Sequence, residues 1–362
     1  MARKRNFSAG PATLPEAVLN RAAAEMTNFK DSGMSVMELS HRSALYESIH
    51  DEVKSRLSRL LSLPADREVL LLQGGASLQF AMVPMNLLEP EDRASYLITG
   101  SWAKKAYKEA QFFGHPEILA STEAEGFRRI PSFSVEDVPK AARYLYLCTN
   151  NTIYGTRIAP ETIPEVGVPL VADMSSNILS EPYDMRHFDL VFAGAQKNLG
   201  PAGLTVVILK KGLLRKASGA LPAILDYRTH MEKGSLYNTP PTYAIYICNL
   251  VLAWIEEMGG LDAVAERNRD KVQMLYDCID ESDLFFNDRA REDRSRTNVV
   301  FTTGDADIDR AFVDRAAERG LINLKGHRSV GGMRASLYNA MEPEGVAELV
   351  TYMKEFEVRN GR

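Results

Sequence analysis

Short apolar runs alternate with segments of helical periodicity through most of the chain. The runs are EVLLLQ, SYLITG, RYLYLCT, VPLVADM, LVFAGA and LTVVILK, and GGASLQFAMVPMNLL and WAKKAYKEAQFF follow the first two. Two helical segments, EAVLNRAAAEM and YESIHDEVKSRLSRLLSL, precede them. Such alternation is typical of crossover connections between parallel strands. The pattern predicts an α/β protein whose large domain has a mostly parallel, mixed sheet covered by helices.

The C-terminal part of the chain follows a different pattern. An apolar helix is predicted over residues 243–258, and a long amphipathic helix comes next. Beyond it lie the strand-like TNVVFTT and GMRASLYNA, the helical DIDRAFVDRAAERG and a last helix that opens at Pro343. We therefore expect a large domain over residues 16–265 and a small α+β domain over residues 266–362, with residues 1–15 joining the small domain.

Charge and composition argue against several classes of protein. The net charge is −5, and no long basic run offers the phosphate contacts that nucleic-acid binding needs. The longest apolar run, residues 243–255, is shorter than the ~20 residues of a membrane span. The opening MARKRNFSAGPATLP lacks the apolar stretch of a secretory signal. Cys148, Cys248 and Cys278 form no C-x-x-C pair, so we expect no zinc site and no disulfide framework. A cytoplasmic protein without a metal, a membrane or a nucleic-acid partner fits best.

Two features follow the first predicted strands, where ligands of open α/β sheets gather. Gly74-Gly75-Ala76-Ser77 stands between a strand and a helix, so backbone N–H groups and a hydroxyl would face an anion such as a phosphate. Trp102 follows the next strand, where its indole would lie on a flat ligand. Each has a simpler interpretation by itself: an ordinary strand-to-helix turn, and an aromatic ring of the core.

Two charged residues end the later strands. Asp173 follows VPLVA directly, and a carboxylate at that depth needs a partner, although it could also cap a helix. Lys197 follows LVFAGA among small residues. A partly desolvated lysine loses its proton readily enough to attack a carbonyl carbon, whereas an ordinary strand-end lysine extends into solvent.

In combination, these strand-end residues match what pyridoxal 5′-phosphate (PLP) requires of a protein. The glycine turn would take the phosphate and Trp102 would cover the ring. Asp173 would pair with the pyridine nitrogen, and Lys197 would form the Schiff base. The sequence therefore predicts a PLP enzyme.

Basic residues recur in two similar motifs far apart in the chain. His41-Arg42 stands in LSHRS and His327-Arg328 in KGHRS, and Arg334 follows in GGMRAS. If these motifs converge they would bind a dianion, because the planar guanidinium makes bidentate contacts to carboxylate and phosphate. Taken singly, each pair is more typical of a solvated loop.

Along its whole length the chain resembles the phosphoserine aminotransferases, class V members of the fold-type I PLP-dependent transferases. The matching stretches are NFSAGPATLP, SVMELSHRS, LQGGASLQF, CTNNTIYGTRI, ADMSSNILS, FAGAQKNLGPAGLT, NTPPTYAIY and GHRSVGGMRASLYNAM. The resemblance implies transfer of an amino group from L-glutamate to 3-phosphohydroxypyruvate, giving O-phospho-L-serine and 2-oxoglutarate in serine biosynthesis. It also implies a homodimer with shared active sites, in which the small domain closes over the substrate.

The resemblance also implies a role for each matching residue. Lys197, Asp173 and Trp102 keep the roles given above, and Thr152 would hydrogen-bond the phenolic oxygen of the ring. Some family members have Gly-Arg where this chain has Ala76-Ser77, which bears on how strongly the phosphate is held. The implied phosphate ligands are Ala76, Ser77, Gln196 and, from the partner subunit, Asn238 and Thr239. The implied substrate ligands are Arg334 for the α-carboxylate, with His327, Arg328 and the partner subunit's His41 and Arg42 for the substrate phosphate.

Other functions stay open on the sequence alone. One is a different class V aminotransferase, such as the alanine:glyoxylate type, and another is a non-catalytic protein that keeps the PLP fold. The paired His-Arg motifs favour a phosphorylated substrate over the first, and intact Lys197 and Asp173 argue against the second. A second role in vitamin B6 synthesis, on 4-phosphohydroxy-L-threonine, also stays open, as in some bacterial relatives.

Overall fold

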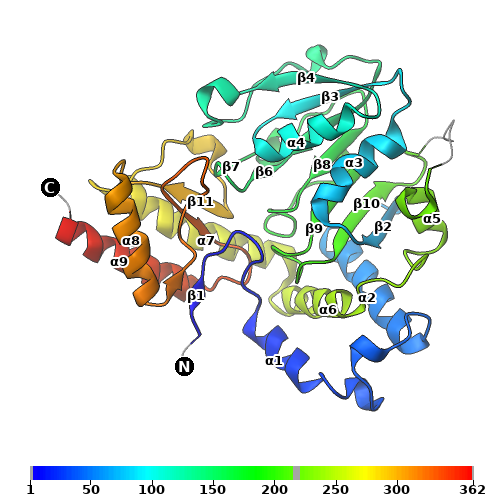
Figure 1. The fold of residues 1–362 in the computed structure, drawn as a ribbon, viewed down its shortest axis with the longest axis horizontal. Coiled ribbons are helices and arrows are strands. Elements are labelled where there is room, and N and C mark those ends of the chain that lie inside the picture. The colour runs from blue at the N-terminus through cyan, green and yellow to red at the C-terminus, as the bar shows by residue number, and fades with distance from the viewer. Residues whose placement is uncertain (1–2, 215–220, 361–362) are drawn as a thin grey trace.

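A seven-stranded sheet forms the centre of the molecule in the computed structural model, which describes residues 3–214 and 221–360 (Figure 1). Its strand order is β2-β10-β9-β8-β5-β3-β4. Within it, β10 runs antiparallel to both neighbours and the other neighbouring pairs are parallel. The mostly parallel, mixed α/β sheet predicted from the sequence is thus confirmed. Its strands are β2 (Arg67–Leu72), β3 (Arg93–Ile98), β4 (His115–Ser121), β5 (Ala142–Cys148), β8 (Leu170–Asp173), β9 (Leu190–Gly194) and β10 (Thr205–Lys210).

Helices cover both faces of this sheet, and alternate strand residues pack against each layer. Leu71 contributes to the core beneath α1 (Glu16–Ala24), α2 (Ala44–Leu60) and α6 (Thr242–Glu257). Leu70 and Leu72 contribute to the core beneath α3 (Gly75–Leu87), α4 (Ser101–Ala110) and α5 (Tyr227–Glu232). Because successive side chains point to opposite faces, a strand buried on both sides is a continuous apolar run. This is why these strands could be predicted from the sequence.

The edge strand β4 was not predicted from the sequence. It pairs only with β3 in the sheet, contains Pro116, and leaves the Ile118 side chain 51% exposed. Proline is tolerated at an edge because the missing N–H faces away from the ladder. A strand half open to solvent lacks the apolar run that identified the others.

The C-terminal part packs around a core of its own, beside the sheet in Figure 1. Strand β1 (Arg5–Asn6) pairs in parallel with β12 (Leu321–Ile322), and Phe7 is buried in that core. The helices and strands predicted after residue 296 are confirmed. The predicted boundary at residue 265 falls inside α7, and the division into domains stays a prediction. The elements are α7 (Gly260–Asp280), β11 (Asn298–Phe301), α8 (Ala306–Glu318), β13 (Met333–Ser336) and α9 (Pro343–Asn360).

The apolar helix α6 is mostly buried in the core, as predicted. Among the described residues, no single helix is long and apolar enough to cross a membrane. Helices α6 and α7 meet that test of length and composition only when taken together, with a bend of 82° between them.

A buried histidine on α2 makes stability depend on pH. His50 is 2% exposed, and burial, aided by the charge of Lys54, lowers its pKa from 6.5 to about 4. The folded state therefore disfavours the protonated ring that the unfolded chain carries at low pH. The contribution of the neutral His50 ring to the free energy of unfolding is fully present above about pH 6.5. It is lost as the pH falls toward 4, at a cost of about 3 kcal/mol.

We expect the free energy of unfolding, measured by urea denaturation, to decline over that pH range. His50→Gln should remove this part of the decline, and an unchanged pH dependence in the variant would contradict the assignment.

Candidate active site

Lys197 lies in a turn just beyond β9, at the carboxyl edge of the sheet. Its Nζ donates a hydrogen bond to Thr152 Oγ1 at 3.0 Å. The N-terminal segment packs along its alkyl chain: a Cβ added at Gly10 would lie 3.6 Å from Lys197 Cγ. The same segment is anchored beside it, because Ala12 N donates to Gln196 O at 2.9 Å. The lysine is thus held between two segments far apart in the sequence.

The environment of Lys197 favours the neutral amine. Burial lowers the pKa of its ammonium, and the charge of Arg334 acts in the same direction. Asp173 and Cys148 oppose this by raising the pKa. A lysine with a lowered pKa has a larger neutral fraction, which is the form that attacks a carbonyl carbon. The geometry therefore suits covalent chemistry at Nζ.

Asp173 ends β8 and is paired in register with Cys148 of β5 and Phe192 of β9. The residue is 5% exposed, and Oδ1 accepts a hydrogen bond from Ser175 N at 2.9 Å. Burial raises its pKa, although Ser175 and the charge of Lys197 lower it. A turn follows it, so the carboxylate does not cap a helix. Among the described residues it takes part in no ion pair, so a cationic ligand atom would satisfy it, as a protonated pyridine nitrogen does.

The glycine turn begins α3 as the sequence predicted. Gly74 has φ 93°, and a Cβ there would fall 2.4 Å from Leu78 Cδ2, so only glycine fits. Ala76 and Ser77 lie in the first helical turn, whose N–H groups have no intrahelical partner and form the positive end of the helix dipole. This end of α3 suits a phosphate.

Asn238 and Thr239 lie beside the glycine turn of their own chain. Thr239 O accepts a hydrogen bond from Gln73 Nε2 at 3.0 Å, and Asn238 and Gly74 both line a cavity of about 290 Å³. Their implied role in the site of a partner subunit stays a prediction.

Trp102 lies in the first turn of α4, partly buried against the core on that face of the sheet. Its Nε1 has no hydrogen-bond partner among the described residues. The preceding Ser101 joins its hydroxyl to that of Tyr154 at 2.9 Å. Tyr154 stands in the hairpin formed by β6 (Asn150–Asn151) and β7 (Thr156–Arg157), which also carries Thr152. The start of α4 is thereby attached to the segment that holds Lys197.

Thr152 connects the two parts of the molecule. Its hydroxyl accepts from Lys197 Nζ, and its carbonyl oxygen accepts from Arg334 Nη1 at 3.1 Å. Arg334 belongs to β13 of the C-terminal part, so the structure brings this predicted substrate ligand next to the predicted nucleophile. Burial lowers the pKa of Arg334, which forms no ion pair with any carboxylate in the described part of the chain.

His327 and Arg328 stand in a loop closed by glycines. Gly326 N donates to Gly332 O at 2.9 Å, and a Cβ on Gly326 would fall 2.0 Å from Gly331 O. His327 Nδ1 lies 2.7 Å from the Ser329 hydroxyl. Burial lowers the pKa of His327, and the charges of Arg334, Arg328 and Lys105 lower it further. The loop thus holds this His-Arg pair in the same field of positive charge as Arg334.

The other His-Arg pair is not joined to this cluster. His41 and Arg42 lie in a turn ahead of α2, and Arg42 is exposed. Within the described residues, neither side chain forms a hydrogen bond or ion pair, and His41 Nε2 is buried without a partner. Their implied action in the site of a partner subunit stays a prediction.

Two contacts at the site were not predicted from the sequence. Gly10 packs on Lys197, and the Tyr338 hydroxyl donates to Ala9 O at 2.8 Å, which ties β13's end to the N-terminal segment. The stretches NFSAGP and SLYNAM contain these residues and were recognised, but nothing local shows which distant atoms they touch.

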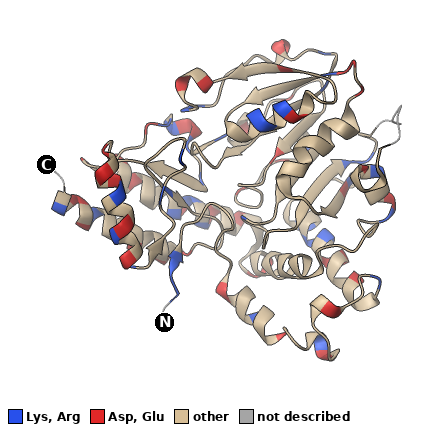
Figure 2. Cartoon of the chain, viewed as in Figure 1, with Lys and Arg blue, Asp and Glu red and all other residues tan. Residues whose placement is uncertain are grey.

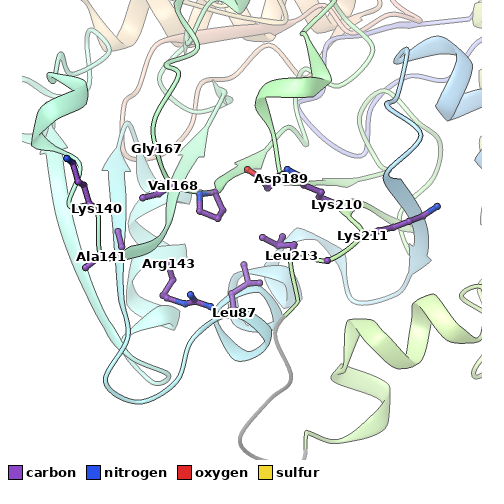
Figure 3. A pocket seen from close by; sticks show the side chains of 13 residues that line it. Leu87, Lys140, Ala141, Arg143, Gly167, Val168, Asp189, Lys210, Lys211 and Leu213 are labelled. Carbon is purple, nitrogen blue, oxygen red and sulfur yellow. Dashed lines mark ion pairs between the residues drawn. The ribbon is translucent and has the colours of Figure 1, made fainter.

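A cavity of about 650 Å³ lies at the opposite, amino edge of the sheet (Figure 3). Three of its basic residues already have acidic partners: Arg143 pairs with Asp92, Lys210 with Asp189, and Lys211 with Glu68. The fourth, Lys140, forms no ion pair within the described residues. Ligands of open α/β sheets bind at the carboxyl edge. We therefore place the candidate active site at Lys197. In the described part of the chain, no group of His, Cys, Asp and Glu side chains is arranged to hold a metal ion.

The sheet and the lysine at its carboxyl edge define a class of protein, the PLP-dependent transferases. The family model described as aminotransferase class-V matches residues 5–349. The phosphoserine aminotransferase of Bacillus subtilis (strain 168) is 50% identical over 361 residues, covering 99% of this chain and 100% of that protein. That of Geobacillus kaustophilus (strain HTA426) is 51% identical over 360 residues, with 99% of each covered. The chain belongs to the aminotransferase class-V family, among its phosphoserine aminotransferases.

Solved structures agree with this assignment. Phosphoserine aminotransferase from Bacillus circulans subsp. alkalophilus matches with a TM-score of 0.96 at 46% identity, covering 99% of both chains. The PLP-bound enzyme from Trichomonas vaginalis matches with a TM-score of 0.89 at 41% identity, covering 97% of this chain and 100% of that one. The predicted fold class and the predicted transaminase activity are confirmed.

Proposed function

We propose that this chain transfers the amino group of L-glutamate to 3-phosphohydroxypyruvate in a PLP-dependent reaction of serine biosynthesis. The products are O-phospho-L-serine and 2-oxoglutarate. The observation that carries the proposal is the contact of Thr152 with both Lys197 Nζ and Arg334 Nη1. A carbonyl-attacking amine and an anion-binding guanidinium are thereby placed on either side of one residue.

The residues present fit the cofactor. Asp173 would take the pyridine nitrogen, Thr152 the phenolic oxygen and Trp102 the face of the ring. The start of α3, with Ala76 and Ser77, would take the phosphate together with Gln196 and with Asn238 and Thr239 of the partner subunit. When bound, PLP supplies an electron sink for the charge that develops at the substrate Cα.

The protein's own side chains perform the remaining tasks. Lys197 would provide the amine that holds the cofactor and the base that takes the substrate's Cα proton, and its lowered pKa suits both roles. Arg334 orients the α-carboxylate, which fixes the Cα–H bond relative to that base. His327 and Arg328 bind the distal anion, which is the phosphate of one substrate and the side-chain carboxylate of glutamate in the other.

We further propose that two copies form a homodimer with shared sites, in the cytoplasm. Arg42 is exposed and forms no ion pair within the described chain, so its guanidinium is available to a neighbouring subunit. The three cysteines are buried free thiols, as suits a reducing compartment.

Arg328→Ala should raise KM for 3-phosphohydroxypyruvate about 10- to 100-fold, because it removes a charged contact to the phosphate. Cofactor affinity, measured by absorbance titration, should change little. Steady-state assays with phosphorylated and unphosphorylated keto acids test both points. Arg310→Ala, on the outer helix α8, is the control and should behave as wild type. Equal losses of cofactor and substrate affinity would contradict this role for Arg328, and a preference for glyoxylate or pyruvate would contradict the proposed function.

A further inference from the structure

Lys105 lies on α4 one turn after Trp102, on the same side of the helix. Its Nζ is 4.5 Å from the centroid of the Trp102 ring, and within the described residues it forms no ion pair. The preceding lysine differs, because Lys104 pairs with Glu123. Figure 2 shows the positions of the basic residues along α4 in blue. The ammonium of Lys105 is thus held over the aromatic ring and is not neutralised.

Three segments meet near the start of α4, the helix that carries Lys105. The start of α4 is joined to the β6–β7 hairpin through the hydroxyls of Ser101 and Tyr154. Tyr154 and Ser329 line the same cavity of about 410 Å³, which places the loop of His327 beside that hairpin. The charge of Lys105 acts on His327 accordingly and lowers its pKa.

The predicted anion ligands at this junction lack acidic partners among the described residues, whereas Arg128 and Arg289, which line the same cavity, both pair with Asp288. Within residues 3–214 and 221–360, Arg328, Arg334 and His327 take part in no ion pair, and only cations and burial act on the pKa of His327. Unbalanced positive charge around a partly desolvated site raises the affinity for a multiply charged anion.

We propose that Lys105 extends the anion-binding surface formed by His327, Arg328 and Arg334, and that it favours substrates whose distal group is a phosphate dianion over those with a carboxylate. The inference rests on the proposed function and adds a specificity-determining residue to it. A single added positive charge interacts about twice as strongly with a dianion as with a monoanion at the same distance. One lysine therefore discriminates between the two substrates that the same pocket must accept.

The test compares Lys105→Gln with Lys108→Gln in the holoenzyme. Lys108 lies one turn further along α4, is exposed and forms no ion pair within the described residues, so it controls for net charge and helix propensity. At low ionic strength, Lys105→Gln should raise KM for 3-phosphohydroxypyruvate about three- to tenfold and KM for glutamate less than about twofold. The difference between the two effects on KM should shrink near 1 M salt, where the Debye length is about 3 Å.

Lys108→Gln should match wild type in both KM values. Equal effects on both substrates, or equal effects of the two variants, would overturn the proposal.

A second measurement separates this proposal from the proposed function. The chain has 6 histidines, so the His327 signal can be assigned in a histidine-labelled NMR spectrum by its loss in His327→Gln. In the substrate-free holoenzyme, Lys105→Gln should raise the pKa of His327, because a cation that lowers it is removed, and Lys108→Gln should leave it unchanged. An unchanged pKa of His327 in Lys105→Gln would show that the Lys105 ammonium does not lie close enough to His327 to act on it. If wild type does not convert the phosphorylated keto acid, the proposed function fails, while this titration still decides where Lys105 acts.

Discussion

Lys197→Ala is expected to abolish amino transfer and the visible absorbance of bound cofactor together. The variant lacks both the amine for covalent attachment and the base for the Cα proton, so kcat should fall about 10³-fold or more. Coupled assays of 2-oxoglutarate formation and an absorbance spectrum after addition of PLP measure the two losses. Borohydride reduction of wild type followed by mass spectrometry should place the cofactor on Lys197.

Other lysines serve as controls for this result. Lys210→Ala removes a strand-end lysine at the opposite edge of the sheet and should leave both readouts unchanged. Lys271 is 1% exposed, and its Nζ already donates hydrogen bonds to Tyr338 O at 2.7 Å and to Met341 O at 3.0 Å. We therefore do not expect it to bind the cofactor in place of Lys197. If Lys197→Ala kept its activity and its absorbance, a different amine would have to do the work.

Asp173→Asn is expected to lower kcat about 10²- to 10³-fold with a smaller effect on KM for either substrate. The amide has nearly the same shape but no charge, so it cannot hold a proton on the pyridine nitrogen, and the charge developing at Cα is less well stabilised. Pre-steady-state measurement of the glutamate half-reaction reports this step directly.

The matched control for that variant is Asp314→Asn, an exposed change of the same chemistry on α8. It should match wild type in both half-reactions. A wild-type rate in Asp173→Asn would show that the Asp173 carboxylate does not hold a proton on the pyridine nitrogen of the cofactor.

Much of the fold could be read from local pattern. The central strands of the sheet are buried on both faces, so each is a continuous apolar run bounded by turn residues, and the helices of the C-terminal part have clear periodicity and caps. Strands β1, β12, β6 and β7 were missed because each has two residues, too few for any period to show. The edge strand β4 was missed because each of its residues is exposed or only half-buried, so it forms no continuous apolar run.

The candidate site was identifiable in part for the same reason. Asp173, Lys197 and the glycine turn each follow a recognisable strand, and the carboxyl ends of parallel strands share one edge. The assignment of His41, Arg42, Asn238 and Thr239 to a partner subunit depends on a second chain, and it stays a prediction.

The sequence by itself determined where the reactive groups stand along the chain: an amine, a carboxylate and an anion-binding turn at successive strand ends. Only the tertiary structure decided their partners. Thr152 meets Lys197 across 45 residues and Arg334 across 182. Gly10, from the other end of the chain, closes over the lysine. The physical reason is that desolvation and charge–charge interactions depend on distance in space, so the lowered pKa of Lys197 exists only once these segments have packed together.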